Sequence, residues 1–391
     1  MSERIYLDWN ATAPVREEAH RAFADALSAT GNPSSVHAEG RAARRLVEEA
    51  RVQVANLVGA EPGNVIFTSG GTEANALALT AAIETAAEKR PRDALLISSV
   101  EHPSVRAGAR FPKEAIIELP IAPDGRLKLA ALAEALAGAS RPLVSVMLAN
   151  NETGVIQPIA EAASMVHAAG GLLHVDAVQA AGRIPCDITA LGADLTTLSA
   201  HKIGGFKGVG ALIRSRDDIH FPDPHIRGGG QERGLRAGTE NVPGIAAFGA
   251  AAAAARAEFA TEAARMLPLR QKLEEGLCAI APETVIFGAK APRLPNTTLF
   301  AVAGVKAETA IIALDLEGVA VSSGAACSSG KVQPSHVLAA MGLPPPLIRA
   351  AVRVSIGWST TEADIERFLS AWRKVIPALS KGSKDKRGIA A

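Results

Sequence analysis

Lys202 lies in a sequence context that favours covalent chemistry. It follows the strand-like run 195–198, and Ser199, His201 and a pair of glycines surround it. Surface lysines normally lie on charged, solvated faces, so an ordinary loop lysine is the weaker interpretation here. The amine of a lysine held in this way can form a Schiff base with a carbonyl compound.

Two further motifs combine polar residues with the end of a predicted strand. Asp176 follows the strand-like run 172–175, and α/β sheets bind ligands at the carboxyl ends of their strands. Gly70, Gly71 and Thr72 lie between a strand and a helix, where glycines and unpaired N–H groups suit a phosphate. Taken alone, the carboxylate is equally well explained as a helix N-cap, and the glycines as an ordinary turn.

Together the three motifs provide what pyridoxal 5′-phosphate (PLP) requires. Lys202 would form the imine with the cofactor aldehyde, and Asp176 would keep the pyridine nitrogen protonated so that the ring can accept electrons. The helix start at Gly71 would hold the phosphate, assisted by Ser199 and His201. We therefore predict a PLP enzyme that carries its cofactor on Lys202.

The elements that position these motifs alternate along the chain. The strand candidates are residues 65–67, 94–97, 143–148, 172–175 and 195–198, and the helix candidates are residues 41–58, 73–88, 128–137 and 159–169. Strands that alternate with helices indicate a mainly parallel sheet covered on both faces. The predicted fold class is therefore α/β.

The later part of the chain has a different pattern. Residues 244–280 predict a long connecting helix with a second helix after Pro268, followed by a smaller α+β unit with strands at 297–302, 319–322 and 351–356. The predicted domains are residues 15–255 for a large PLP-binding unit, residues 1–14 and 256–378 for a small unit, and residues 379–391 for a disordered tail. The tail is polar and lacks periodicity.

Composition limits the partners that we expect. The 391 residues are 48% hydrophobic and 21% charged, which suits a soluble protein with a large core. Lys and Arg number 41 against 40 for Asp and Glu, so charge gives no case for nucleic acid or an anionic membrane. No apolar run approaches the ~20 residues of a membrane span, and we expect a cytoplasmic location.

The three cysteines are Cys186, Cys278 and Cys327. They lie far apart without C-x-x-C spacing, so we expect neither a disulfide framework nor a cysteine-based zinc site. A lone cysteine in a Ser/Gly-rich loop, such as Cys327, is usually an inert thiol. With an ordinary pKa of ~8.5 it would need a neighbour to activate it.

The sequence resembles the NifS/IscS-type cysteine desulfurases of the class V aminotransferase family, in the group with the longer catalytic loop. The resemblance spans residues 5–375. Its motifs are SAHKIGG at 199–205, NNETG at 150–154, HVDAVQ at 174–179, NPSSVH at 32–37, EHPSV at 101–105, RAGTEN at 236–241 and SSGAACSSG at 322–330. In the motif DWNATA at 8–13, Ala13 stands where the family often has a second threonine.

The resemblance implies the PLP-dependent transferase type I fold, a homodimer, and conversion of L-cysteine to L-alanine with a persulfide left on Cys327. Catalysis would rest on Lys202, Cys327 and His102. The cofactor would be bound by Gly71, Thr72, His102, Asn151, Asp176, Gln179, Ser199, His201, Lys202 and, donated by the partner subunit, Thr239. The substrate would be bound by Arg353, Asn151 and Asn32.

Within this scheme Gln179 would bond the phenolic oxygen of the ring, His102 would stack on the ring, and Arg353 would clamp the substrate carboxylate. Taken without the family, Arg353 is better explained by a structural carboxylate partner. The resemblance implies no metal of the chain's own, although Cys327 could share an iron–sulfur cluster with a scaffold. The sulfur acceptor would be such a scaffold or another protein.

Two other functions stay open from the sequence. One is a related PLP enzyme of the same fold, either a selenocysteine lyase or an aminotransferase, although an aminotransferase has no use for Cys327. The other is a non-catalytic sulfur-transfer partner, against which the set of Lys202, Asp176 and His102 argues.

Overall fold

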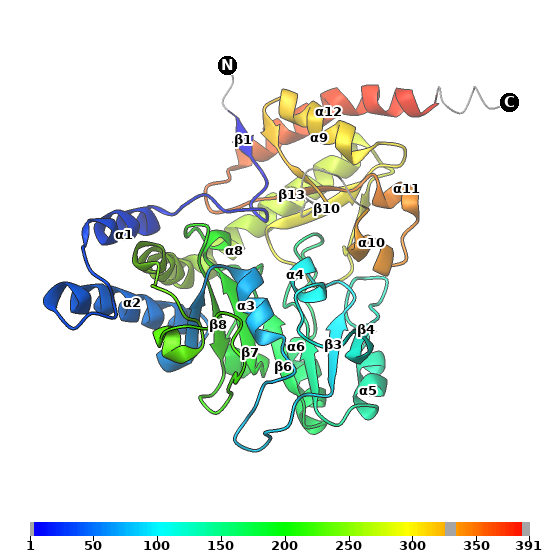
Figure 1. Cartoon of the computed structure of the whole chain (residues 1–391). Helices are drawn as coiled ribbons and strands as arrows, with labels where there is room; N and C mark the ends of the chain where they lie inside the picture. The colour runs from blue at the N-terminus through cyan, green and yellow to red at the C-terminus, as the bar shows by residue number, and fades with distance from the viewer. Residues whose placement is uncertain (1–3, 325–333, 385–391) are drawn as a thin grey trace.

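A seven-stranded sheet forms the centre of the larger of two lobes (Figure 1). The computed structural model describes residues 4–324 and 334–384. The strand order is β2-β8-β7-β6-β5-β3-β4, and β8 is antiparallel to both neighbours while the remaining pairs are parallel. The strands are β2 (Val65–Thr68), β3 (Ala94–Ser98), β4 (Ile116–Leu119), β5 (Pro142–Ser145), β6 (Leu172–Asp176), β7 (Leu195–Ser199) and β8 (Gly210–Arg214). The predicted α/β class with a mainly parallel sheet is confirmed.

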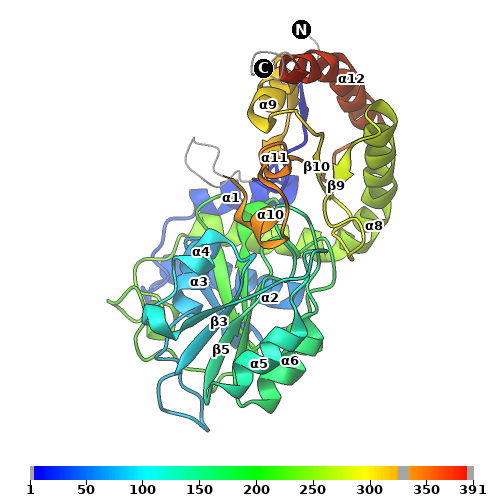
Figure 2. The same cartoon turned by 90° about the vertical axis from the view of Figure 1, so that its right-hand side faces the viewer.

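Helices cover both faces of this sheet (Figure 2). They are α1 (Glu17–Ser28), α2 (Ala38–Leu57), α3 (Gly71–Ala78), α4 (Pro103–Arg106), α5 (Leu129–Ala137), α6 (Ile159–Ala168), α7 (Ile188–Leu191) and α8 (Val242–Ile280). Because side chains alternate along a strand, Val65 and Phe67 of β2 share a core with α2, α5, α6 and α8, while Ile66 packs with α3 and α4. The strands are buried on both sides, as a sheet between two helical layers requires.

Helix α3 is shorter than the predicted 73–88. It ends at Ala78, and the chain beyond it runs without a helix until β3. The β-branched residues Thr80, Ile83 and Thr85 lower the helix propensity of this stretch. Ile83 is fully buried in the same core as α3, so the segment covers the sheet without forming a helix.

The second lobe holds a four-stranded antiparallel sheet in the order β12-β13-β10-β9. Its strands are β9 (Val285–Ile286), β10 (Thr297–Ala301), β12 (Ser322–Ser323) and β13 (Val352–Ser355), and its helices are α9 (Ala307–Leu316), α10 (His336–Ala340), α11 (Pro345–Ile348) and α12 (Glu362–Lys384). The N-terminal strand β1 (Ile5–Tyr6) joins this lobe by pairing in parallel with β11 (Val319–Ala320). The division at residues 14/15 and 255/256 stays a prediction.

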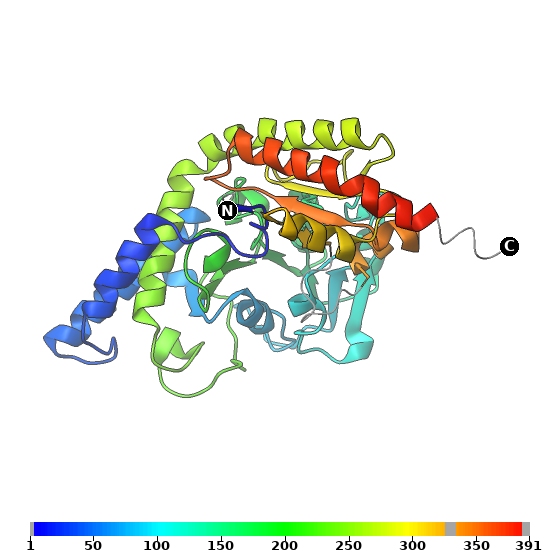
Figure 3. The same cartoon turned by 90° about the horizontal axis from the view of Figure 1, so that it is seen from above.

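Helix α8 connects the lobes without a break, whereas the sequence predicted two helices separated at Pro268. Proline cannot bond the carbonyl of the residue four positions earlier, here Ala264. Both residues are exposed, so water can satisfy that carbonyl and the helix continues. Figure 3 shows α8 bending as it passes from one lobe to the other, and then lying beside α12.

Helix α12 also corrects one prediction. It continues through residues 379–384, which the sequence assigned to a disordered tail. An apolar face that includes Phe368, Trp372 and Ile376 anchors the helix in the core of the second lobe, and the last turns extend from that anchor. Residues 385–391 lie outside the described part. Within the two described ranges, no helix is long and apolar enough to cross a membrane.

Candidate active site

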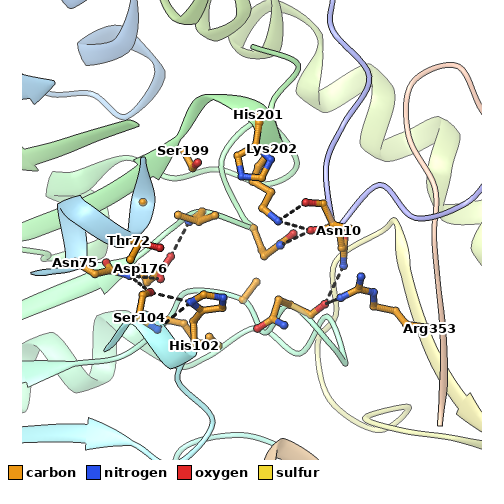
Figure 4. A pocket seen from close by; sticks show the side chains of 17 residues that line it. Asn10, Thr72, Asn75, His102, Ser104, Asp176, Ser199, His201, Lys202 and Arg353 are labelled. Atoms are coloured by element: carbon orange, nitrogen blue, oxygen red, sulfur yellow. Dashed lines mark hydrogen bonds between the residues drawn. The ribbon is translucent and has the colours of Figure 1, made fainter. Parts of the chain in front are cut away.

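A cavity of about 280 Å³ lies where the central strands end and the two lobes meet (Figure 4). β6 ends in Asp176 and β7 ends in Ser199, so the last residues of these two parallel strands line the cavity. Most of the residues predicted from sequence line it. They are Gly71, Thr72, His102, Asn151, Asp176, Gln179, Ser199, His201, Lys202 and Arg353.

Lys202 occupies the short 3-10 turn that follows β7. Its Nζ donates hydrogen bonds to the carbonyl oxygens of Asn10, at 2.5 Å, and Ala11, at 2.8 Å. The N-terminal segment thus reaches across to the lysine from the second lobe, and Figure 4 shows the amine directed toward it. The two carbonyls hold the amine at the cavity wall.

Asp176 is nearly buried and both of its carboxylate oxygens accept hydrogen bonds. Oδ1 accepts from the backbone N–H of Val178 at 3.0 Å, and Oδ2 accepts from Nδ2 of Asn75 at 2.9 Å. These two contacts fix the orientation of the Asp176 carboxyl group at the cavity wall, where it suits the pyridine nitrogen of PLP.

His102 is connected to Asp176 through two side chains (Figure 4). Asn75 donates from Nδ2 to Oγ of Ser104 at 2.9 Å, and that oxygen lies 2.8 Å from Nδ1 of His102. The backbone N–H of Ser104 also donates to Nδ1, at 3.2 Å. Burial lowers the pKa of His102, so the ring is neutral, and an accepting Nδ1 leaves its proton on Nε2.

The end of the cavity nearest α3 carries neutral donors. Thr72 lies in the first turn of α3, and Ser199 and His201 face it from the end of β7. Nδ1 of His201 lies 3.2 Å from Oγ1 of Thr12, and burial, with the charge of Lys202 next, lowers the pKa of His201 to about 4. Thr12 belongs to the same N-terminal motif as Ala13, which is buried and whose N–H donates to the carbonyl of His201.

Arg353 lies in β13 and is almost fully buried. Its Nη2 donates to Oδ1 of Asp8 at 2.7 Å, and its Nη1 donates to the carbonyl oxygen of Asn151 at 2.9 Å. Nε is buried without a partner. The structural explanation for this arginine therefore holds in part, because a carboxylate does pair with it, while the guanidinium still lines the cavity.

Three predicted residues lie elsewhere. Thr239 lines a separate cavity of about 150 Å³ with Ser69 and Arg236. Asn32 is exposed between α1 and α2, where its Oδ1 accepts the N–H of Ser34. Cys327 lies outside the described residues.

The sequence reasoning missed several residues that line the same cavity. They are Asn10, Ala11, Asn75, Ser104, Met147, Ala149 and Val178. Helical spacing could have found Asn75, which lies three residues after Thr72 on one face of α3. Ser104 lies inside the quoted motif at 101–105, and Asn10 lies inside the motif at 8–13.

The lining fits PLP. At Gly71, an added Cβ would lie 3.1 Å from Cγ2 of Val178 and 3.5 Å from Cβ of Ser199, so the wall is closely packed at this glycine. Neutral donors at the start of α3 suit a phosphate, and the carboxylate of Asp176 and the amine of Lys202 suit the two reactive parts of the ring. Among the described residues, no group of three or more His, Cys, Asp and Glu side chains could hold a metal.

The sequence matches the family described as "Aminotransferase class-V" over residues 5–368. The chain belongs to this family. It therefore has the type I fold of PLP enzymes and depends on PLP.

The relatives agree on one activity. The cysteine desulfurase of Cereibacter sphaeroides is 42% identical over 383 residues, which cover 96% of this chain and 97% of that protein. The cysteine desulfurase IscS of Dictyoglomus turgidum is 39% identical and covers 97% of this chain and 96% of its own. The X-ray structure of a NifS-like protein from Rickettsia africae superposes with a TM-score of 0.87 at 35% identity, over 96% of this chain and 100% of that one. The resemblance stated from the motifs is confirmed, and these relationships support a PLP-dependent cysteine desulfurase.

Proposed function

We propose that this chain converts L-cysteine to L-alanine and transfers the sulfur to Cys327 as a persulfide. The observation that carries the proposal is the convergence of Lys202, Asp176 and Arg353 on one cavity. An amine, a fixed carboxylate and a guanidinium are the groups that hold PLP and an amino acid substrate. Atoms balance, since L-cysteine and the Cys327 thiol give L-alanine and the Cys327 persulfide.

Each residue that would hold PLP is assigned to one chemical group of the cofactor. Gly71, Thr72, Ser199 and His201 would hold the phosphate at the start of α3, and Asp176 would pair with the ring nitrogen. Gln179 would bond the phenolic oxygen, and Lys202 would supply the covalent link. When bound, PLP supplies an electron sink that lowers the cost of removing a proton from the substrate Cα.

The chain's own residues then bind the substrate and move protons. Arg353 and Asn151 bind the carboxylate of L-cysteine, a task that suits a bidentate guanidinium. The Lys202 amine, when not linked to PLP, would remove the Cα proton of the substrate. His102 lines the same cavity and would stack on the PLP ring, with the proton of its neutral imidazole on Nε2. Asn32 stays a predicted substrate contact.

Cys327 is the proposed sulfur acceptor. The described residues on each side of its segment, Gly324 and Pro334, line one cavity of about 160 Å³, so both ends of the segment return to the same place in the second lobe. A thiolate at Cys327 attacks the substrate sulfur, the bond from that sulfur to carbon breaks, and the carbon fragment is released as L-alanine after protonation.

The proposal also covers how the protein chains assemble and which protein receives the sulfur. Two copies form a homodimer, in which Thr239 of each chain contacts the phosphate in the other, and its position outside the main cavity supports this. The persulfide then passes to an iron–sulfur scaffold or another acceptor protein in the cytoplasm.

Mass spectrometry after incubation of the PLP-loaded enzyme with L-cysteine tests the function. We expect one added sulfur on the peptide that holds Cys327 and none on peptides with Cys186 or Cys278, together with released alanine. Alanine without sulfur on Cys327, or persulfide at the exposed Cys278 instead, would contradict the proposed acceptor. Transamination products instead of alanine would indicate an aminotransferase.

A further inference from the structure

Behind the proposed cofactor site lies a buried arginine, Arg183, that forms no ion pair with a carboxylate of the described residues. Arg183 is 7% exposed, and its hydrogen bonds all go to carbonyl groups. Nη1 donates to the backbone oxygen of Gln179 at 2.6 Å and to its Oε1 at 3.1 Å, and Nη2 donates to the carbonyl of Lys202 at 3.3 Å. Arg183 thus contacts Gln179, which is proposed to bond the phenolic oxygen of PLP, and Lys202, which is proposed to form the covalent link to PLP.

Burying a guanidinium without a counter-charge costs free energy. Arg16 lies in the same region and shows the usual solution, because it donates to the carbonyl of Ile203 and pairs with Glu258 at 2.5 Å. No carboxylate among the described residues makes an ion pair with Arg183. The lack of an ion pair is therefore specific to Arg183, since the neighbouring buried Arg16 does have a carboxylate partner.

Arg183 determines how the amide of Gln179 is oriented. A guanidinium only donates, so the group that faces it must be the amide oxygen. Nε2 then points the other way and donates to the carbonyl of Asn10 at 3.0 Å. One N–H remains for the cavity that Gln179 lines, and it lies beside the carbonyl that also accepts from Lys202.

Arg183 is positively charged at neutral pH, and the charged and titratable groups around it do not neutralise that charge. Burial and the charge of Arg353 lower the pKa of Arg183 to about 10, so it is protonated at neutral pH. Burial raises the pKa of Cys186 to about 12, so that thiol is neutral. Glu262 lines a small cavity of about 20 Å³ with Arg183, Arg16 and Lys202, but it pairs with Arg265 at 3.0 Å.

We propose that Arg183 is a positioning residue that fixes Gln179 as an N–H donor toward the cavity and places an unpaired positive charge behind Lys202. Both effects favour an anionic oxygen on the bound ligand next to Lys202. The inference rests on the proposed function, since the anionic oxygen is the phenolic oxygen of PLP. Arg183 touches neither substrate nor cofactor and acts through Gln179 and through its charge.

A pH titration of the visible absorbance of the PLP-loaded enzyme tests this role. When the nitrogen that links PLP to Lys202 loses its proton, the phenolic oxygen is left fully anionic. An N–H donor from Gln179 and the positive charge of Arg183 stabilise this form, so they lower the pH at which the absorbance changes. We expect Arg183→Met to move the transition upward by about one pH unit or more. Gln179→Glu should move it in the same direction, because a carboxylate paired with Arg183 cannot donate to the oxygen. Arg183→Lys keeps the charge and should move it less.

Arg16→Met is the matched control, because it removes a buried arginine whose charge is already paired. It should titrate as the wild type does. Wild-type titration in both Arg183→Met and Gln179→Glu, or an equal shift in Arg16→Met, would overturn the inference. If Arg183→Met does not fold, Gln179→Glu and Arg183→Lys decide the question by the same readout. A wild-type protein without the visible band would overturn the proposed function and this inference with it.

Discussion

Arg353 donates a hydrogen bond from Nη2 to Oδ1 of Asp8 over 2.7 Å, across a separation of 345 residues in the chain. This contact fixes the plane of the guanidinium, and the carbonyl of Asn151 fixes its other nitrogen. The clamp proposed for the substrate carboxylate is thus oriented before any substrate binds. Such orientation lowers the cost of ordering a long side chain on binding.

We expect Arg353→Ala to raise KM for L-cysteine about tenfold to a hundredfold, since a hydrogen-bonded charge pair contributes about 1.5–3 kcal/mol. Steady-state kinetics measure this change. Asp8→Asn keeps the guanidinium and loses only its charged partner, so it should raise KM less. An unchanged KM in Arg353→Ala would refute the clamp.

Lys202→Ala should abolish the visible absorbance band of covalently bound PLP, because no other amine among the residues that line the cavity can form that link. Turnover should fall about 10³-fold or more, since the proposed function assigns removal of the Cα proton to the same amine. Lys207→Ala is the control, because that lysine is exposed in the same loop. A band that persists in Lys202→Ala would exclude Lys202 as the site of attachment.

Asn75→Ala should weaken PLP binding about tenfold, as judged by cofactor release on dialysis, because it removes one of two donors that hold the carboxylate of Asp176. Asn75→Asp should be worse, since it places a second carboxylate against Asp176. Ser104→Ala leaves the bond between Asn75 and Asp176 intact. If it weakens PLP binding as much as Asn75→Ala, the contact with Asp176 is not the cause.

The raised pKa of Glu152 predicts that the free energy of unfolding depends on pH. It is buried, and burial raises its pKa to about 7, although Oγ of Ser335 donates to it at 2.5 Å. A carboxyl group whose folded pKa exceeds its unfolded value binds more protons when folded, so stability falls as pH rises from about 4.5 to about 7. The full effect is roughly 3.5 kcal/mol at most, from about 1.4 kcal/mol per pKa unit.

Glu152→Gln should remove that part of the pH dependence, since an amide does not titrate and can donate to Ser335. Urea unfolding of wild type and variant at pH 5 and pH 8 measures it. We expect the variant to gain stability relative to the wild type at pH 8. Parallel pH profiles for the two proteins would show that Glu152 does not titrate in this range.

The sequence by itself was enough for the α/β class, for the positions of most central strands and for the group of Lys202, Asp176 and the glycine motif. These features are local, because a strand, a turn and the residue that follows them are encoded within a few positions. It failed where the surroundings of a segment decide its conformation. Helix α3 ends before the β-branched residues Thr80 and Ile83, and Ile83 packs on the sheet without a helix, while α8 continues past Pro268 at a position where Ala264 and Pro268 are exposed.

Only the tertiary structure decided which side chains hold the catalytic groups in place. The link from Asp176 through Asn75 to Ser104, the pairing of Arg353 with Asp8, and the contact of Arg183 with Gln179 all depend on orientation. A hydrogen bond needs a donor and an acceptor about 3 Å apart and aligned. Periodicity shows which face of an element is buried, but residues as distant in sequence as Asp8 and Arg353 reach that alignment only when the N-terminal segment has packed beside β13 in the second lobe.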